Sequence, residues 1–207
     1  MDPKKDVVSV GGERVWFSRD IKNVYFMLNK PRGFITTLED KHAKKNVRML
    51  MEKVDIRVFP VGRLDKDSEG LLIMTNDGDL ANLISHPSSG VSKSYRVSVK
   101  PAADEAQLAL LASGVELEDG TSAPASVRVT GGEKERTVFE ITLKEGKNRE
   151  IRRMCDAVGL EVIRLKRTSV GPLRLGNLPS GKYRELTKQE IMALRGACKR
   201  TEKKQNG

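Results

Sequence analysis

Asp65 is the residue whose setting best suits it to chemistry. It closes the tetrapeptide Gly-Arg-Leu-Asp (residues 62–65), which lies between two apolar runs, 58–61 and 71–74. This pattern predicts two strands joined by a turn, with Asp65 half-buried where a strand meets the loop. A carboxylate there is either neutralised by a partner or kept for chemistry, because an unpaired buried charge is costly. For an isolated tetrapeptide, a surface pair between Arg63 and a nearby acid is the simpler interpretation.

Three further blocks of sequence accompany this one. In chain order, the four blocks are Asn29-Lys30-Pro31-Arg32-Gly33, residues 61–72, Lys93-Ser94-Tyr95, and residues 145–154 with Asn148-Arg149-Glu150-Ile151-Arg152-Arg153 at their centre. Together they resemble the motifs of the RsuA/RluB-type pseudouridine synthases, in the expected order. The resemblance covers residues 22–197, and its last block continues into residues 164–167 and 171–173.

The resemblance implies an activity and a site. The expected reaction is the isomerisation of a specific uridine to pseudouridine in ribosomal RNA, with no metal or other cofactor. The family's nucleophile matches Asp65, its tyrosine Tyr95 and its catalytic arginine Arg152. Leu165 matches an apolar residue that packs beneath the tyrosine or the base. Family members often have His-Gln before the arginine; Arg149-Glu150 stands there in this chain, which favours the RluB-like branch and the large-subunit RNA.

The expected chemistry accounts for these residue types. A base in structured RNA must be flipped out before it can react. The site then needs a nucleophilic carboxylate, an aromatic face against the uracil and a cation that keeps the carboxylate ionised. The phenol of Tyr95 is also placed to remove the proton from the rejoined carbon. Whether Asp65 attacks the sugar or the uracil ring first stays open.

Helix periodicity separates the arginines of the last block. The apolar stripe of the predicted helix comprises Ile151, Met154, Cys155 and Val158. At ~100° per residue, Arg152 flanks this stripe, whereas Arg149 and Arg153 point nearly opposite it. We therefore expect Arg152 to be the charge partner of Asp65, and Arg149 and Arg153 to be solvated or on phosphate.

Other basic residues are assigned to the RNA. Lys30, Arg32 and Lys93 are expected to contact phosphates, which position RNA without reading its sequence. Arg63 is expected to orient the surroundings of the flipped nucleotide or to fill the vacancy that it leaves. An internal salt bridge from Arg63 to Asp67 or Glu69 is nearly as well supported.

The pattern of elements favours an α+β fold. Strands are expected near 24–28, 34–37, 57–61, 70–75, 94–100, 125–130, 137–143, 161–167 and 182–186, and helices at 47–53, 79–85, 104–112 and 149–158, with a last helix after Thr187. The resemblance adds a mixed, mostly antiparallel sheet in two half-domains with a central active-site cleft. The expected catalytic domain spans 22–197, followed by a basic flexible tail, 198–207. Residues 1–21 resemble the final strand and linker of an N-terminal RNA-binding module whose helices are missing, as in an isolated or truncated catalytic domain.

Composition agrees with an RNA partner. The 207 residues carry 38 Lys and Arg against 28 Asp and Glu, a net charge of +10, which favours a polyanion over an apolar ligand. No apolar run suits a membrane span or a signal peptide, so a cytoplasmic monomer is expected. Cys155 and Cys198 are expected to be reduced thiols, and His42 and His86 give no zinc site.

Three alternatives use the same residues differently. Asp65, Asp67 and Glu69 mimic the start of a calcium loop, but position twelve is Asn76 and no exit helix follows. A glycoside hydrolase needs two acids across a sugar, which residues two apart on one turn supply poorly. A catalytically silent RNA-binding or ribosome-assembly factor is the main alternative; its weakness is Asp65, because a binding module gains nothing from a carboxylate that repels phosphate.

Overall fold

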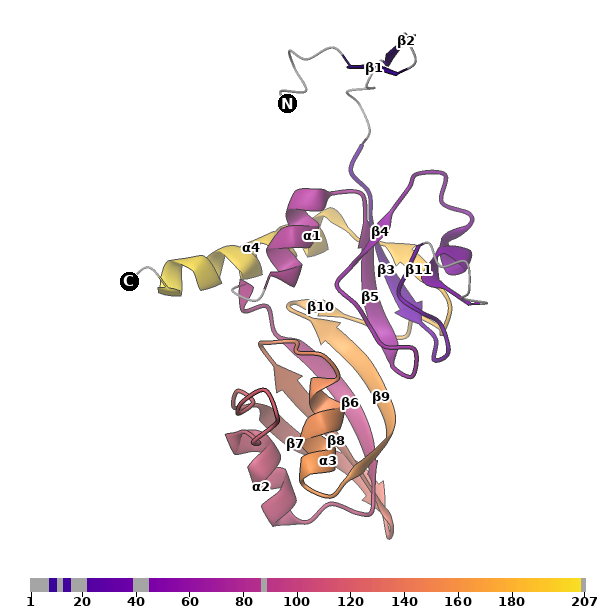
Figure 1. The fold of residues 1–207 in the computed structure, drawn as a ribbon. Helices are drawn as coiled ribbons and strands as arrows, with labels where there is room; N and C mark the ends of the chain where they lie inside the picture. Colours follow the sequence, from indigo (N-terminus) through magenta and orange to yellow (C-terminus); the bar gives the residue numbers. More distant parts are fainter. Residues whose placement is uncertain (1–7, 11–12, 16–21, 39–44, 87–88, 206–207) are drawn as a thin grey trace.

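The computed structural model describes residues 8–10, 13–15, 22–38, 45–86 and 89–205. Residues 8–10 and 13–15 form a separate two-stranded sheet, and the rest form two half-sheets with helices packed on them (Figure 1). The strands are β1 (Val8–Val10), β2 (Glu13–Val15), β3 (Tyr25–Lys30), β4 (Phe59–Val61), β5 (Glu69–Thr75), β6 (Lys93–Lys100), β7 (Ser126–Glu133), β8 (Arg136–Leu143), β9 (Glu161–Val170), β10 (Leu173–Arg174) and β11 (Tyr183–Glu185). The helices are the 3₁₀ helix η1 (Val47–Met51), α1 (Gly78–Ser85), α2 (Glu105–Ser113), α3 (Glu150–Ala157) and α4 (Lys188–Gln205).

One continuous sheet joins the two halves. Its strand order is β11-β3-β5-β9-β6-β8-β7, and all its pairings are antiparallel except β5 with β9. That parallel pairing covers only Glu69 with Lys166 and Gly70 with Arg167. Along the same edge of β5, β4 pairs with residues 73–75. The turn between β4 and β5, which contains Asp65, therefore lies where β9 replaces β4 as the neighbour of β5.

Gly70 makes this change of neighbour possible. Its φ is +108°, and a Cβ placed on it would lie 2.2 Å from the backbone oxygen of Arg167. A side chain cannot be accommodated there, because no real Cβ approaches a backbone oxygen so closely. The two half-sheets thus approach each other backbone to backbone at the base of the Asp65 turn.

The first half, β11-β3-β5 with β4, is buried on both faces. Leu71 and Ile73 point into a cluster completed by α1 and α4, whereas Leu72 and Met74 point into a second cluster that includes η1. Alternate residues of a strand face opposite sides of a sheet. Burial on both faces explains why β5 reads as an unbroken apolar run.

The second half, β9-β6-β8-β7, is buried mainly on one face. Val97 and Val99 of β6 and Phe139 and Ile141 of β8 pack with α2 and α3 in a third cluster. The residues between them are more exposed, as Arg96 shows. Polar and apolar residues therefore alternate along these strands, which is typical of a sheet with one solvated face.

The structure confirms the α+β class and most of the predicted elements. Two predictions are wrong: residues 34–37 form only an isolated bridge, from Ile35 to Asn46, and the predicted helix at 47–53 is the shorter 3₁₀ helix η1. The capping box of the last helix is confirmed, since Thr187 Oγ1 accepts from Glu190 N–H at 3.2 Å and Glu190 Oε2 accepts from Thr187 N–H at 2.9 Å.

The two ends of the chain differ from the sequence-based interpretation. The predicted final strand of an N-terminal module is a pair of short antiparallel strands, β1 and β2; the rest of residues 1–21 lies outside the described part, as does His42. At the other end, α4 extends to Gln205, so residues predicted as a flexible tail from 198 onward are helical up to that point.

Candidate active site

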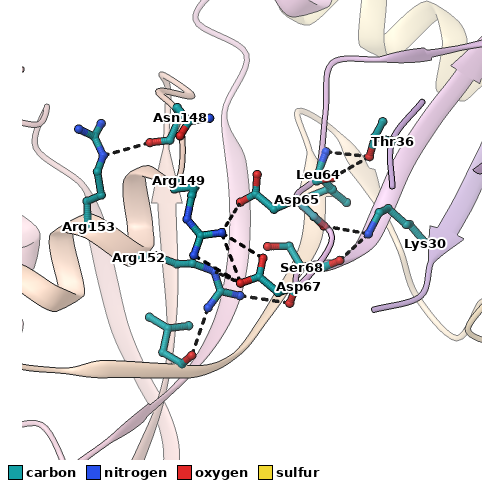
Figure 2. A network of polar contacts seen from close by, with 11 residues as sticks. Lys30, Thr36, Leu64, Asp65, Asp67, Ser68, Asn148, Arg149, Arg152 and Arg153 are labelled. Atoms are coloured by element: carbon teal, nitrogen blue, oxygen red, sulfur yellow. Dashed lines mark hydrogen bonds and ion pairs between the residues drawn. The ribbon is translucent and has the colours of Figure 1, made fainter. Parts of the chain in front are cut away.

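The Asp65 turn is held by its neighbours on both sides (Figure 2). The side chain of Asp65 is 30% exposed, which confirms the predicted half-buried position. Thr36 Oγ1 donates to Leu64 O at 2.7 Å and accepts from Leu64 N–H at 3.2 Å, and Gly33 N–H donates to Lys66 O at 2.6 Å. The loop that carries the first sequence block thus fixes the backbone on either side of Asp65.

Lys30 supports the turn from beneath. Its side chain is fully buried, and its Nζ donates to Asp65 O at 2.9 Å, Ser68 O at 2.7 Å and Pro31 O at 3.2 Å. Burial lowers the pKa of Lys30 to about 8, against the opposing effect of the Asp65 and Asp67 charges. All three donors of the ammonium are used. The prediction that Lys30 contacts phosphate is therefore wrong, because the group is enclosed and already bonded.

Two arginines reach the turn from the other side. Arg149 Nη1 lies 3.8 Å from Asp65 Oδ2 and 3.3 Å from Asp67 Oδ1. Arg152 Nη2 donates to Asp67 O at 3.1 Å and its Nη1 to Val162 O at 3.2 Å, while its Nε forms an ion pair with Asp67 Oδ2 at 3.2 Å. The prediction that Arg152 is the charge partner of Asp65 is therefore wrong. The ion-pair partner of Asp65 is Arg149, and Arg152 forms its ion pair with Asp67.

Arg152 is nevertheless the arginine of α3 that enters the site. Its side chain is 12% exposed, against 46% for Arg149, and burial lowers its pKa while Asp67 opposes that shift. Ile151, Met154 and Cys155 are buried and Val158 is partly buried, so the predicted stripe is confirmed. Arg153 points away from Asp65 and forms a bidentate pair with Asp119, at 2.8 and 3.1 Å. Its Nε donates to Asn148 O, as Figure 2 shows.

Arg149 has an unusual backbone. It is the residue immediately before α3, and its φ of +47° is the one positive value among described residues other than glycine. A residue with a Cβ adopts this conformation at a cost, and such strain is found preferentially at functional sites. The sequence gives no sign of it, since asparagine or glycine is the usual residue there.

Tyr95 lies at the junction of the two halves. It packs against the core clusters of both the first and the second half-sheet, and a bulge in the pairing of β6 with β9 falls beside it. Leu165 is 6% exposed in the third cluster, which packs the second half-sheet against α2 and α3. Both residues adjoin the contact of β5 with β9, because Tyr95 pairs with Arg167 and Leu165 precedes Lys166 in β9.

Arg167 is a residue of the site that sequence reasoning missed. It is 4% exposed, its Nε donates to Leu71 O at 2.7 Å and its Nη1 to Arg63 O at 3.4 Å. Its guanidinium thus binds both ends of the segment that contains Asp65. The sequence signal for it was an arginine at an inward-facing position of the strand that became β9. A guanidinium buried there needs hydrogen-bond acceptors.

The remaining predicted residues differ in exposure. Arg32 and Arg63 are exposed beside the turn. In the part of the chain that the structure describes, Arg63 forms no ion pair, because Asp67 and Glu69 pair with arginines of the second half. Lys93 is partly buried; burial lowers its pKa, and the charge of Arg167 acts in the same direction.

Neither a metal site nor a membrane helix is found among the described residues. No cluster of three His, Cys, Asp or Glu side chains has ligand geometry there. No described helix is both long enough and apolar enough to cross a membrane. The site thus offers a carboxylate that is surrounded by cations, at the junction of the two half-sheets where Tyr95 also lies.

Known proteins are similar to this chain along most of its length. A model of the family described as RNA pseudouridylate synthase matches residues 24–157. The chain is 40% identical to an RNA pseudouridine synthase of Aquifex aeolicus over 94% of its length and 77% of the relative's. The chain belongs to the RNA pseudouridylate synthase family. It is accordingly an isomerase that converts uridine to pseudouridine in RNA, which confirms the activity expected from the four sequence blocks.

Two other similarities place it more closely. The chain is 40% identical to the ribosomal large subunit pseudouridine synthase B of Bacillus subtilis, over 92% of this chain and 78% of that one. A solved pseudouridylate synthase superposes with a TM-score of 0.73 at 29% identity, covering 84% of this chain and 74% of the other. The RsuA/RluB-type resemblance is confirmed on these grounds.

Proposed function

We propose that this synthase modifies a uridine of large-subunit ribosomal RNA, and that Asp65 is its nucleophile. The observation that carries the proposal is a carboxylate held in one place by contacts from both halves of the protein. Asp65 lies on a turn that is fixed by Lys30 and Arg167 through its backbone and by Arg149 through its side chain. Effective nucleophilic catalysis requires this kind of preorganisation.

The reaction needs a bond broken and a bond formed at the same sugar carbon. The glycosidic bond from the ribose to the uracil nitrogen breaks, the uracil turns, and a ring carbon bonds to the ribose. The nitrogen gains a proton and the ring carbon loses one. Tyr95 is the proposed stacking partner of the flipped uracil and the proposed acceptor of that proton, with Leu165 in the cluster behind it.

Arg152 is proposed to keep the site electrostatically positive while Arg149 contacts Asp65. Because Arg152 donates to the backbone of Asp67 and forms an ion pair with its carboxylate, it also fixes the turn two residues after the nucleophile. Exposed Arg32 and Arg63, with Lys93, are the proposed contacts for RNA phosphates. Arg153 is assigned a lesser role, since Asp119 already occupies its guanidinium.

The choice of ribosomal RNA rests on the relatives and on charge. The Bacillus subtilis relative at 40% identity is named for the large ribosomal subunit. The net charge of +10 suits a highly charged polyanion. We propose in addition that the protein acts as a monomer in the cytoplasm, without a metal or other cofactor.

Mapping pseudouridine across ribosomal RNA tests the proposal. RNA from cells that lack the gene is compared with RNA from cells complemented with the wild-type gene. We expect one large-subunit position, or a small set, to lose its modification and to regain it on complementation. Loss at a small-subunit or transfer-RNA position would overturn the substrate assignment, and an unchanged map would favour a silent binding factor.

A further inference from the structure

Glu150, which follows Arg149, has an environment that does not suit a charged carboxylate. It is 4% exposed. Its Oε2 accepts from Lys147 N–H at 3.0 Å, but its Oε1 is buried and receives no hydrogen bond from any described donor. A buried carboxylate oxygen without a donor is strongly disfavoured.

Another acid lies within hydrogen-bonding reach of the Glu150 side chain. Glu145 faces it across the loop that precedes α3, and Glu145 Oε1 accepts from Ala123 N–H at 2.7 Å. Two carboxyl groups in contact cannot both be ionised without strong repulsion. Sharing a single proton satisfies both, because the protonated group donates to the other.

The surroundings decide where the proton resides. Burial raises the pKa of Glu150 to about 7, and the hydrogen bond with Glu145 contributes to that shift. The same hydrogen bond lowers the pKa of Glu145. The proton therefore belongs on Glu150. The other charged groups that face this pair are Lys147 of the same loop, Lys93 of β6, Arg153 of α3 and Asp119 of the loop after α2.

The pair is joined to the site through the backbone. Glu150 N–H approaches Lys147 O at 3.4 Å while Lys147 N–H donates to the Glu150 side chain, so the turn at 147–150 is closed from both directions. Arg149 lies inside this turn with its φ of +47°. Such a conformation persists only where the surroundings enforce it.

We propose that Glu150 is a positioning residue: as a neutral carboxyl group it donates a hydrogen bond to Glu145 and so holds the turn that presents Arg149 to Asp65 and Asp67. This inference builds on the proposed role of Asp65. It assigns a function to a buried acid that takes no part in the chemistry itself.

A pH dependence follows from the shared proton. The folded protein keeps the proton on Glu150 up to about pH 7, whereas the unfolded chain releases it near the ordinary value of 4.5. Between these values the folded state binds more protons, so the contribution to the free energy of unfolding is full below about pH 4.5 and is lost as the pH rises through 7. At higher pH the two carboxylates repel, and the Arg149 turn loosens.

Glutamine at position 150 separates this role from simple packing. Glu150→Gln keeps the shape and a donor toward Glu145 but has no proton to lose, whereas Glu150→Ala removes the bond at every pH. Glu133→Gln is the control, because Glu133 pairs with Arg136 at an exposed position far along the chain from the site. Each full-length protein is compared by urea unfolding and by single-turnover pseudouridine formation from pH 5.5 to 8.5.

We expect the rate of Glu150→Gln relative to wild type to rise with pH, by about tenfold per pH unit above 7 if only the neutral form positions Arg149. Glu150→Ala should be slower than Glu150→Gln at every pH and slower than wild type at pH 6, where the glutamine variant should match wild type. Glu133→Gln should follow wild type. A constant rate ratio overturns the positioning role, and an unfolding profile shared by wild type and Glu150→Gln overturns the shared proton.

These outcomes are distinct from a failure of the proposed function. If the wild-type protein makes no pseudouridine in large-subunit RNA, the substrate assignment fails while the unfolding curves still decide whether Glu150 holds a proton. If Asp65→Asn stays active, the nucleophile assignment fails, and the ratio of Glu150→Gln to wild type still reports on the Arg149 turn.

Discussion

At the scale of single residues, the site depends as much on cations that donate to backbone carbonyls as on cations that pair with carboxylates. Lys30 and Arg167 are both buried, and between them they bind the carbonyls of Arg63, Asp65, Ser68 and Leu71. Because a carbonyl within a tight turn has few other partners, these bonds determine where Asp65 points. The same two residues also place positive charge near Asp65.

Replacing Lys30 tests this structural role. Lys30→Met keeps the length of the side chain but removes a donor from three carbonyls, of which Asp65 O keeps its bond from Ser68 N–H. We expect the free energy of unfolding to fall by about 2 kcal/mol or more, since each unsatisfied buried group costs roughly 1–3 kcal/mol. Urea unfolding measures the change. Lys66→Met, on the same turn but exposed, is the matched control. Equal stability of the two variants would show that the Lys30 bonds contribute little.

Sequence reasoning placed residues in the site better than it paired them. Periodicity put Arg152 beside the apolar stripe of α3, and the structure buries it there. Periodicity could not show that Asp67, two residues after Asp65, lies close to that helix and pairs with Arg152. Lys30 was assigned to phosphate for a related reason: a lysine beside proline and glycine reads as an exposed loop residue, and its burial depends on a turn 35 residues away.

At the scale of elements, the decisive feature is the change of neighbour along β5. A continuous apolar run predicted β5, and apolar alternation predicted β6, β8 and β9, because each strand has at least one core face to satisfy. The parallel contact of β5 with β9 was not predictable, since only two residue pairs define it and they are 97 positions apart. Gly70 was the visible sign, as a glycine within a strand pattern marks a close backbone approach.

A matched pair of glycine substitutions tests this contact. Gly70→Ala and Gly120→Ala impose the same kind of backbone strain, at φ of +108° and +101°, but only at Gly70 does the added methyl meet backbone, at 2.2 Å. We expect Gly120→Ala to lose about 1 kcal/mol of stability. Gly70→Ala should lose about 3 kcal/mol or more and separate β5 from β9. Similar losses in thermal or urea unfolding would show that the close approach is not required.

At the scale of the whole molecule, two half-sheets with separate cores meet at the site, and the charge of the chain is predominantly positive. The resemblance of four sequence blocks predicted the mixed sheet in two halves, which the structure confirms. The length of α4 and the β1 and β2 pairing were not anticipated, because terminal segments carry few of the apolar residues on which periodicity depends.

Salt dependence of RNA binding tests which part of this charge meets the RNA. Arg32→Ala and Arg63→Ala, beside the Asp65 turn, should each reduce the slope of log affinity against log salt by about 0.7 to 0.9. Arg128→Ala is the control, because Arg128 is exposed on β7 at the far edge of the sheet. Titrations with one large-subunit RNA fragment at several salt concentrations give the slopes. A larger change for Arg128→Ala would place the RNA on the other side.

The central claim is that Asp65 performs the isomerisation, and the formation of pseudouridine by Asp65→Asn tests it most directly. Wild type, Asp65→Asn and the exposed control Asp79→Asn are each incubated with large-subunit RNA from cells lacking the gene, and product and RNA affinity are measured in parallel. We predict no product from Asp65→Asn, with RNA affinity equal to or slightly above wild type because a charge that repels phosphate is gone, and normal product from Asp79→Asn. Pseudouridine formation by Asp65→Asn at the wild-type rate would contradict the claim.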